Sequence, residues 1–226
     1  MHHRFKLPAF IICIAIVAGM VFTGCNNADE QKQDTWIPVE VPEGIVSGDV
    51  LIEYNNVFRS SYTDDNGVTR ATEISCFFSS YYDRPEDIDL SRFLKYCPLG
   101  EPVTDEEEFQ EVKKTADFEF GSDTLRSMPT PLWKYYKEEV DSLLLKYSGI
   151  TTDDLSGGLH YLKDTVYVES QKAFYNCTSD FGPGSFAATK GMRQGNLIIL
   201  TDSKEVTLTI EINNGYPLIR SFAEGE

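Results

Sequence analysis

Three cysteines and one histidine are the side chains in the body of this chain best suited to nucleophilic chemistry. Cys76, Cys97 and Cys177 carry thiols, and His160 is the only histidine beyond residue 3. A thiol enzyme needs a base next to its sulfur, so a Cys177–His160 dyad is the arrangement to consider. Because no flank of the three thiols matches a family of cysteine hydrolases, we expect His160 to pack or to face water. A single histidine also excludes zinc helices of the H-E-x-x-H type.

Carboxylates are the second source of chemistry. Asp83, Glu86, Asp87 and Asp89 lie close enough in the chain to offer oxygen ligands to Ca²⁺. The run lacks the spacing and the glycine of an EF-hand loop, so we expect these acids to cap helices and face solvent. A glycosidase would need two carboxylates facing each other across a cleft, and no spacing in the sequence identifies such a pair.

The segment from Tyr175 to Phe186 is the densest unusual stretch of the sequence. It ends a strand in small polar residues, turns through Gly-Pro-Gly and resumes at Phe186. This pattern predicts a wide, rigid turn between two strands. The functional alternative is a binding loop, with Phe181 as an exposed anchor and Asp180 as its polar contact. Asp-Phe-Gly also occurs in kinases, but the phosphate loop, strand lysine and H-R-D loop of that family are missing.

The first 25 residues have the organisation of an export signal. Basic residues at positions 4 and 6 precede an apolar segment over 7–22, and small residues then lead to Cys25. About 16 apolar residues form a helix of about 24 Å, which is short for a bilayer core of roughly 30 Å. Phe22-Thr23-Gly24-Cys25 resembles the lipobox of bacterial lipoproteins. The resemblance implies a signal peptide over 1–24, a palmitate-type lipid on Cys25, and a membrane-anchored protein on the extracytoplasmic face.

Composition adds constraints on partners and redox state. Loss of the signal lowers the formal charge from −16 to about −18, and phosphates repel so acidic a domain, so we expect no nucleic-acid partner. No Walker loop, G-x-S-x-G elbow or C-x-x-C occurs, and we expect no cofactor and no bound metal. Three thiols outside the cell leave at least one unpaired. Any one pair of Cys76, Cys97 and Cys177 could form a disulfide, or none.

The elements that position these groups begin after a polar stretch. Residues 25–44 have no apolar periodicity and predict a flexible tether, followed by a single domain over 45–226. Residues 49–58 are rich in aliphatic and aromatic types and predict a strand. Asp-Asn-Gly within 64–67 predicts a tight turn, and 69–82 the returning strand of an N-terminal β-hairpin.

Helices are predicted in the middle of the chain and strands toward its end. Asp89 is expected to cap a short helix, Thr104 to cap a helix over 105–114, and Gly149 to end a longer helix that starts at residue 130. Short β runs follow at 166–169, 173–177, 185–189, 197–200, 206–212 and 218–222. The expected fold class is α+β, with an antiparallel β meander in the C-terminal third packed against two or three helices and the N-terminal hairpin.

One resemblance covers most of the expected domain. The Tyr175–Phe186 segment and the run from Cys76 through Phe93 to Tyr96 resemble uncharacterised, lipid-anchored secreted proteins of Gram-positive bacteria. That resemblance implies that the region folds as a unit, and it implies no activity. We therefore expect a non-enzymatic binding or interaction module of the cell envelope with a protein or glycan ligand. The alternative is a cell-envelope hydrolase that uses carboxylates or a lone thiol.

Overall fold

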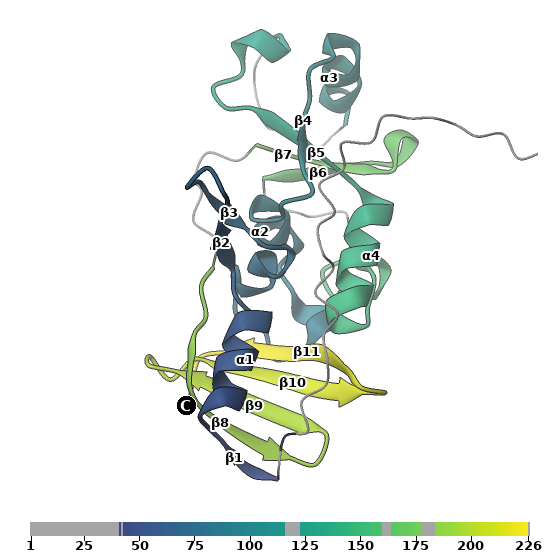
Figure 1. Cartoon of the computed structure of the whole chain (residues 1–226). Coiled ribbons are helices and arrows are strands. Elements are labelled where there is room, and N and C mark those ends of the chain that lie inside the picture. The colour runs from purple at the N-terminus through teal and green to yellow at the C-terminus, as the bar shows by residue number, and fades with distance from the viewer. Residues whose placement is uncertain (1–40, 42, 116–122, 160–163, 178–183, 226) are drawn as a thin grey trace, which may run out of the picture. The chain divides into compact units, whose positions relative to one another are not determined.

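Three antiparallel sheets organise the chain (Figure 1). The computed structural model describes residues 41, 43–115, 123–159, 164–177 and 184–225, all within one compact unit. The largest sheet has the order β1-β8-β9-β10-β11, the second β4-β5-β7-β6, and the third is the hairpin β2-β3. Because every strand pair is antiparallel and helices pack between the sheets, the α+β class is confirmed.

The bounds of the elements are as follows. The strands are β1 (Gly44–Val46), β2 (Ser61–Thr63), β3 (Thr69–Ala71), β4 (Glu101–Pro102), β5 (Leu132–Tyr136), β6 (Thr165–Val168), β7 (Ala173–Cys177), β8 (Ala188–Gln194), β9 (Leu197–Asp202), β10 (Thr207–Asn213) and β11 (Tyr216–Ala223). The α-helices are α1 (Asp49–Val57), α2 (Leu90–Lys95), α3 (Glu106–Lys113) and α4 (Lys137–Ser148). The 3₁₀ turns are η1 (Glu73–Phe78), η2 (Pro85–Asp87), η3 (Leu125–Ser127), η4 (Thr152–Asp154) and η5 (Glu169–Gln171). Among the described residues, no helix has the length and apolar character needed to cross a bilayer.

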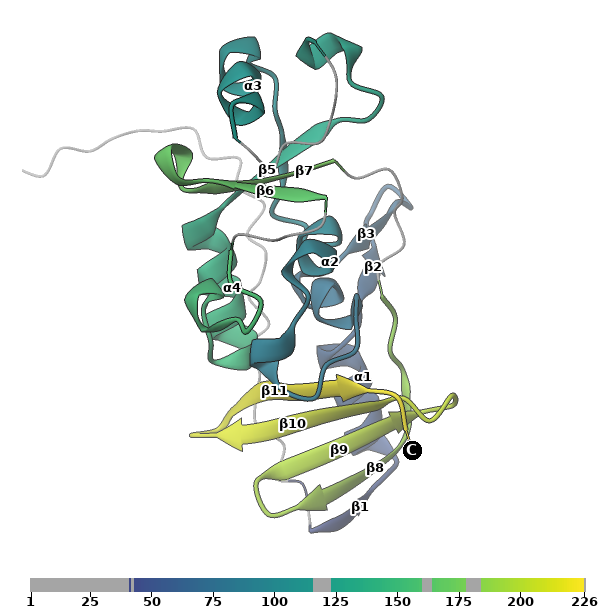
Figure 2. The same cartoon turned by 180° about the vertical axis from the view of Figure 1, so that it is seen from behind.

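Strict alternation builds the five-stranded sheet. In β10, Leu208 and Ile210 are buried while Thr207 and Thr209, which alternate with them, are partly exposed, as expected for a strand with one covered face. Helix α1 lies across that covered face, in front of the sheet in Figure 1 and behind it in Figure 2. The side chain of Asn55 fixes the helix there, because it accepts from the Ala188 amide (2.7 Å) and donates to the Ala188 carbonyl (2.9 Å).

The opposite face of this sheet is open to solvent at one edge. Ile45 and Met192 lie directly across from each other on β1 and β8 and are 77% and 44% exposed. The neighbouring Val46 points the other way and is buried. This sheet therefore carries a small exposed apolar pair on the side that α1 does not cover.

The domain begins before the predicted end of the tether. Val41 is buried, its carbonyl accepts from Arg193, and the Glu43 carboxylate accepts from the Gly195 amide at 3.1 Å. Gly44 already belongs to β1. The tether prediction over 25–44 is thus wrong for its last residues, because pairing with β8 draws them into the sheet. Residues 25–40 of that prediction lie outside the described part.

The predicted strand over 49–58 is wrong, since most of it forms helix α1. Its composition favours a strand, but burial recurs at Tyr54 and Phe58, four residues apart, which is the helical period. The tight turn is confirmed, because Asp64 accepts from the amides of Asn66 and Val68. The strands that it joins, β2 and β3, are only three residues long, and much of the predicted returning strand is the 3₁₀ turn η1.

The predicted helix from residue 130 starts seven residues too early. Residues 132–136 form the strand β5 between β4 and β7, and α4 begins only at Lys137. The end is confirmed, because Gly149 adopts a φ of 77° that side chains with a Cβ disfavour. Asp89 caps α2 as predicted. The cap of α3 is Asp105 and not Thr104, since the Asp105 carboxylate accepts from two amides of the first turn.

The six predicted β runs near the end divide between two sheets. Three of them correspond to β9, β10 and β11, whereas the run predicted over 185–189 overlaps β8 only at its first two residues. Strands β8 to β11 form a meander through successive hairpins. The other two runs are β6 and β7, which pair with β5 in the four-stranded sheet. That second sheet has its own buried cluster, in which Phe109 and Val112 of α3 pack against Leu132 and Tyr175.

Candidate functional site

The residues predicted for the binding loop and for lipidation are not placed by the structure. Asp180, Phe181, His160 and Cys25 all lie outside the described residues. Cys177 is the last described residue before the predicted loop, and it pairs with Leu132 across β7 and β5. The environment of this strand end therefore locates the region from which the loop departs.

A pocket of about 250 Å³ lies at that strand end. It is mostly apolar and is lined by Val103, Leu125, Met128, Pro129, Thr130, Pro131 and Leu132. Leu132 of the lining pairs with Cys177 across β5 and β7, so the pocket lining neighbours the last described residue before the loop. The sequence prediction missed this pocket because residues 130–132 were assigned to a helix, although the prolines at 129 and 131 favour an extended chain.

Helix α3 holds the wall of the pocket in place. The Glu106 carboxylate accepts from the Leu125 amide at 2.9 Å, and the Gln110 amide group donates to the Asp123 carbonyl at 3.0 Å. The turn η3 is closed by a capping box between Thr124 and Ser127. These contacts connect the pocket to α3.

Helix α3, which is bonded to the pocket wall through Glu106, is acidic in its first turn. Between Asp105 and Glu111 the helix and its cap carry five carboxylates, of which four are exposed: Asp105, Glu106, Glu107 and Glu111. Clustered charges of one sign attract ligands of the opposite sign. The pocket thus combines an apolar interior with a flank that favours cations.

The described thiols do not have the electrostatics of nucleophiles. Burial raises the pKa of Cys177 to about 11, and burial together with the neighbouring Cys97 raises the pKa of Cys76 well above its usual range. A catalytic cysteine needs the opposite, a pKa lowered by nearby positive charge. Neither of these two thiols is therefore activated as the lone-thiol hydrolase alternative requires.

A charged cluster beneath α3 joins the helix to the four-stranded sheet. The Lys134 ammonium lies 2.8 Å from the Glu108 carboxylate, which also accepts from the Tyr175 hydroxyl at 2.6 Å. The Lys134 ammonium also lies 4.5 Å from the centroid of the Tyr136 ring. Burial, followed by the bond to Glu108, raises the pKa of Tyr175. The Glu108 carboxylate thus accepts from both Lys134 and Tyr175, and the Lys134 ammonium balances its charge. The cluster therefore serves to hold α3 on the sheet.

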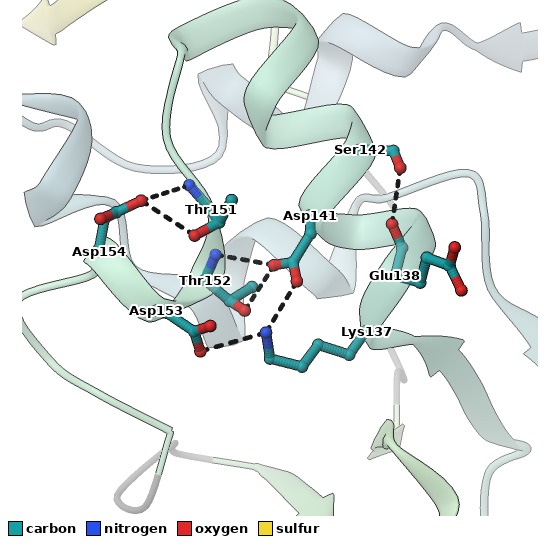
Figure 3. A network of polar contacts seen from close by, with 8 residues as sticks. All are labelled: Lys137, Glu138, Asp141, Ser142, Thr151, Thr152, Asp153 and Asp154. Atoms are coloured by element: carbon teal, nitrogen blue, oxygen red, sulfur yellow. Dashed lines mark hydrogen bonds and ion pairs between the residues drawn. The ribbon is translucent and has the colours of Figure 1, made fainter.

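A second network fixes the start of α4 to η4 (Figure 3). The Lys137 ammonium contacts Asp141 at 2.7 Å and Asp153 at 3.1 Å, and Asp141 accepts from the amide and hydroxyl of Thr152. Burial alone would raise the pKa of Asp141, but the bonds from Lys137 and Thr152 hold that pKa below its usual value. A glycosidase acid needs a raised pKa, so Asp141 does not have that property.

The predicted acidic run around residue 86 forms no metal site. Asp87 makes two 2.9 Å bonds to Arg84 and accepts from Ser156, while Asp89 caps α2. No group of three or more ligands suited to a metal ion occurs among the described residues.

The apolar pocket remains the best candidate site, because it is the feature that a ligand could enter without displacing an existing ion pair. Its position at the end of β7 also places it where the predicted loop departs. Comparison with known proteins adds no further guide: no family model, curated protein or solved structure matches this chain.

Proposed function

We propose that this protein is a lipid-anchored, extracytoplasmic lipoprotein that acts as a non-enzymatic binding module of the cell envelope. Its pocket at the end of β7 receives an apolar side chain from a basic segment of a partner protein. The observation that carries the proposal is the apolar pocket of about 250 Å³ connected to the acidic helix α3. The lipobox ending at Cys25 supports the location.

The size and lining of the pocket favour a side chain over a whole small molecule. Small-molecule sites usually enclose about 300–1,000 Å³, and this one is smaller. Its lining is dominated by apolar side chains and prolines, which suits an aliphatic group better than the hydroxyls of a glycan. Burial of one such side chain contributes about 1.5–3 kcal/mol, so on this contribution alone a short peptide should bind with a dissociation constant of about 6–80 mM.

The enzymatic alternative receives no support from these contacts. Cys177 has a raised pKa, and the carboxylates of Asp141 and Glu108 are each held by a lysine. A hydrolase would instead need a thiol or an acid whose pKa is shifted toward reactivity. A binding function requires no shift in the pKa of this thiol or of these carboxylates.

The lipid anchor makes a direct prediction. Cells expressing the full chain and fed a radiolabelled or alkyne-tagged fatty acid should label the wild-type protein and not Cys25→Ala, because the acyl chains attach at that cysteine. Cys177→Ala is the matched control and should keep the label. Label that persists in Cys25→Ala would overturn the anchor.

Binding in the pocket can be followed by two methionine methyl signals. Met128 lines the pocket and Met192 lies on the open face of the large sheet, and they are the two methionines that remain after residue 25. We expect the peptide Lys-Lys-Leu-Lys-Lys to shift the ¹³C-methyl resonance of Met128 and leave that of Met192 unchanged. The response should weaken with salt, because the negative charge of α3 is screened.

Two control peptides separate the contributions. Replacing the central leucine by serine should remove the Met128 shift, and replacing the lysines by glutamates should weaken it at least several-fold. The variant Thr130→Lys, at another residue of the pocket lining, should lose the Met128 shift, whereas Met192→Lys should keep it. Equal responses of both methyls, or no response of Met128 at about 80 mM peptide, would contradict the proposal.

A further inference from the structure

Two of the three described thiols meet where η1 packs against α2. Cys76 belongs to η1, and Cys97 follows the end of α2. Both residues are buried in the same core cluster, with Cys76 1% and Cys97 7% exposed, and the thiols are close enough for Cys97 to add to the effect of burial in raising the pKa of Cys76. The preceding residues are bonded to each other, since the Ser75 hydroxyl donates to the Tyr96 carbonyl at 3.2 Å.

The packing around this pair fixes both segments. The ring of Phe77 lies edge-on to the ring of Phe93, with centroids 5.0 Å apart, and the Cys76 thiol also donates to the Glu73 carbonyl at 3.0 Å. Cys177 is elsewhere, on β7 beside Thr130. Of the three possible disulfides, the packing therefore favours Cys76–Cys97. Cys177 lies apart from that pair.

We propose that Cys76 and Cys97 form a disulfide when the chain folds in the presence of a disulfide oxidant, and that Cys177 remains a thiol. One thiolate attacks the oxidant's disulfide and forms a mixed disulfide, and the second thiolate then displaces the oxidant's sulfur. The two thiols lose two protons and two electrons, and the oxidant's disulfide is reduced to two thiols. In the cell, this rests on the proposed extracytoplasmic location, where such oxidants act.

The burial of both sulfurs determines when the bond forms. A thiol that is sealed in the core cannot reach an oxidant, so exchange must precede the packing of η1 on α2. Once formed, the bond closes a loop of about 20 residues, which restricts the unfolded chain. Reduction should then lower the Tm of the full chain by roughly 5–10 °C.

The pairing can be mapped on the full-length protein isolated from membranes. The protein is denatured, alkylated without reduction, digested with trypsin and analysed by mass spectrometry. The expected result is a linked pair of peptides spanning 71–92 and 96–113, and an alkylated Cys177 in the peptide 173–190. In Cys97→Ala, Cys76 should become alkylated. Cys177→Ala is the matched control and should keep the linked pair and its sensitivity to reductant.

A second arm makes the result independent of location. The chain is unfolded under reducing conditions and refolded with reduced and oxidised glutathione, and the same peptides are mapped. Formation of the 71–92 to 96–113 link supports the proposal. A bond that includes Cys177, or three alkylated thiols after refolding, overturns it. The fatty-acid label on Cys25 tests the location separately, so a failure of the anchor is distinguishable from a failure of the pairing.

Discussion

Replacement of Phe77 by alanine is expected to lower the free energy of unfolding by about 4 kcal/mol. The side chain is fully buried, and its ring contacts those of Phe93 and Tyr147 edge-on, with centroids 5.0 and 5.6 Å away. These rings come from η1, α2 and α4, so the substitution opens a cavity where three elements converge. Urea unfolding followed by tryptophan fluorescence and circular dichroism measures the loss.

The matched control for this prediction is Ile52→Ala on α1. Ile52 is 58% exposed, and its truncation should change the free energy of unfolding by less than about 0.5 kcal/mol. A loss below about 2 kcal/mol for Phe77→Ala would show that the three elements do not share one packed core. Unchanged m-values in both variants would confirm that the comparison concerns the same folded state.

Replacement of Glu108 by glutamine is expected to cost about 3 kcal/mol, because Lys134 is left largely buried without its carboxylate. The double variant Glu108→Gln/Lys134→Met should recover at least half of that loss, since it removes the uncompensated charge. If the double variant recovers none of the lost free energy of unfolding, the uncompensated charge of Lys134 is not the cause of the loss. Urea titrations of the two single variants and the double variant complete the cycle.

The same cluster predicts how stability depends on pH. Burial is the largest single influence and lowers the pKa of Lys134, but the interactions with Glu108 and Tyr136 together outweigh it, so the pKa of Lys134 is raised overall. Above about pH 10.4 an unfolded lysine loses its proton while the folded Lys134 retains it. The stabilisation is therefore complete below that pH and is lost as the pH rises through the folded pKa. Tyr175, whose pKa is also raised, acts in the same direction above about pH 10.

Local signals in the sequence predict the features that depend on neighbouring residues alone. The turn at Asp64, the cap at Asp89 and the stop at Gly149 each need only a few residues, and all three are found where predicted. The predicted alternation of buried and exposed residues in β10 is also observed, because one face of the sheet is covered and the other is not. These elements could be placed without knowledge of the tertiary fold.

The remaining features depend on contacts between distant residues. Residues 132–136 suit a helix or a strand by composition, and pairing with β7 about 40 residues later decides the outcome. The same error concealed the pocket and the Lys134–Glu108 cluster, since both depend on β5 being extended. The contact between Cys76 and Cys97 also arises only when η1 meets α2. The residue pattern of one segment alone does not predict a tertiary contact with a distant segment.

The pairing of β1 with β8 has a consequence for the order of folding. Arg193 reaches back to the carbonyl of Val41, 152 residues earlier in the chain, and β1 has no partner in its sheet other than β8 within the described residues. Contacts of such long range form slowly, because a large loop must close first. β1 therefore cannot pair until residues up to 194 are available, and the five-stranded sheet cannot be completed until residue 223 is available. Under the export that we propose for this chain, such a delay is useful, because the largest sheet assembles only after most of the polypeptide has crossed the membrane.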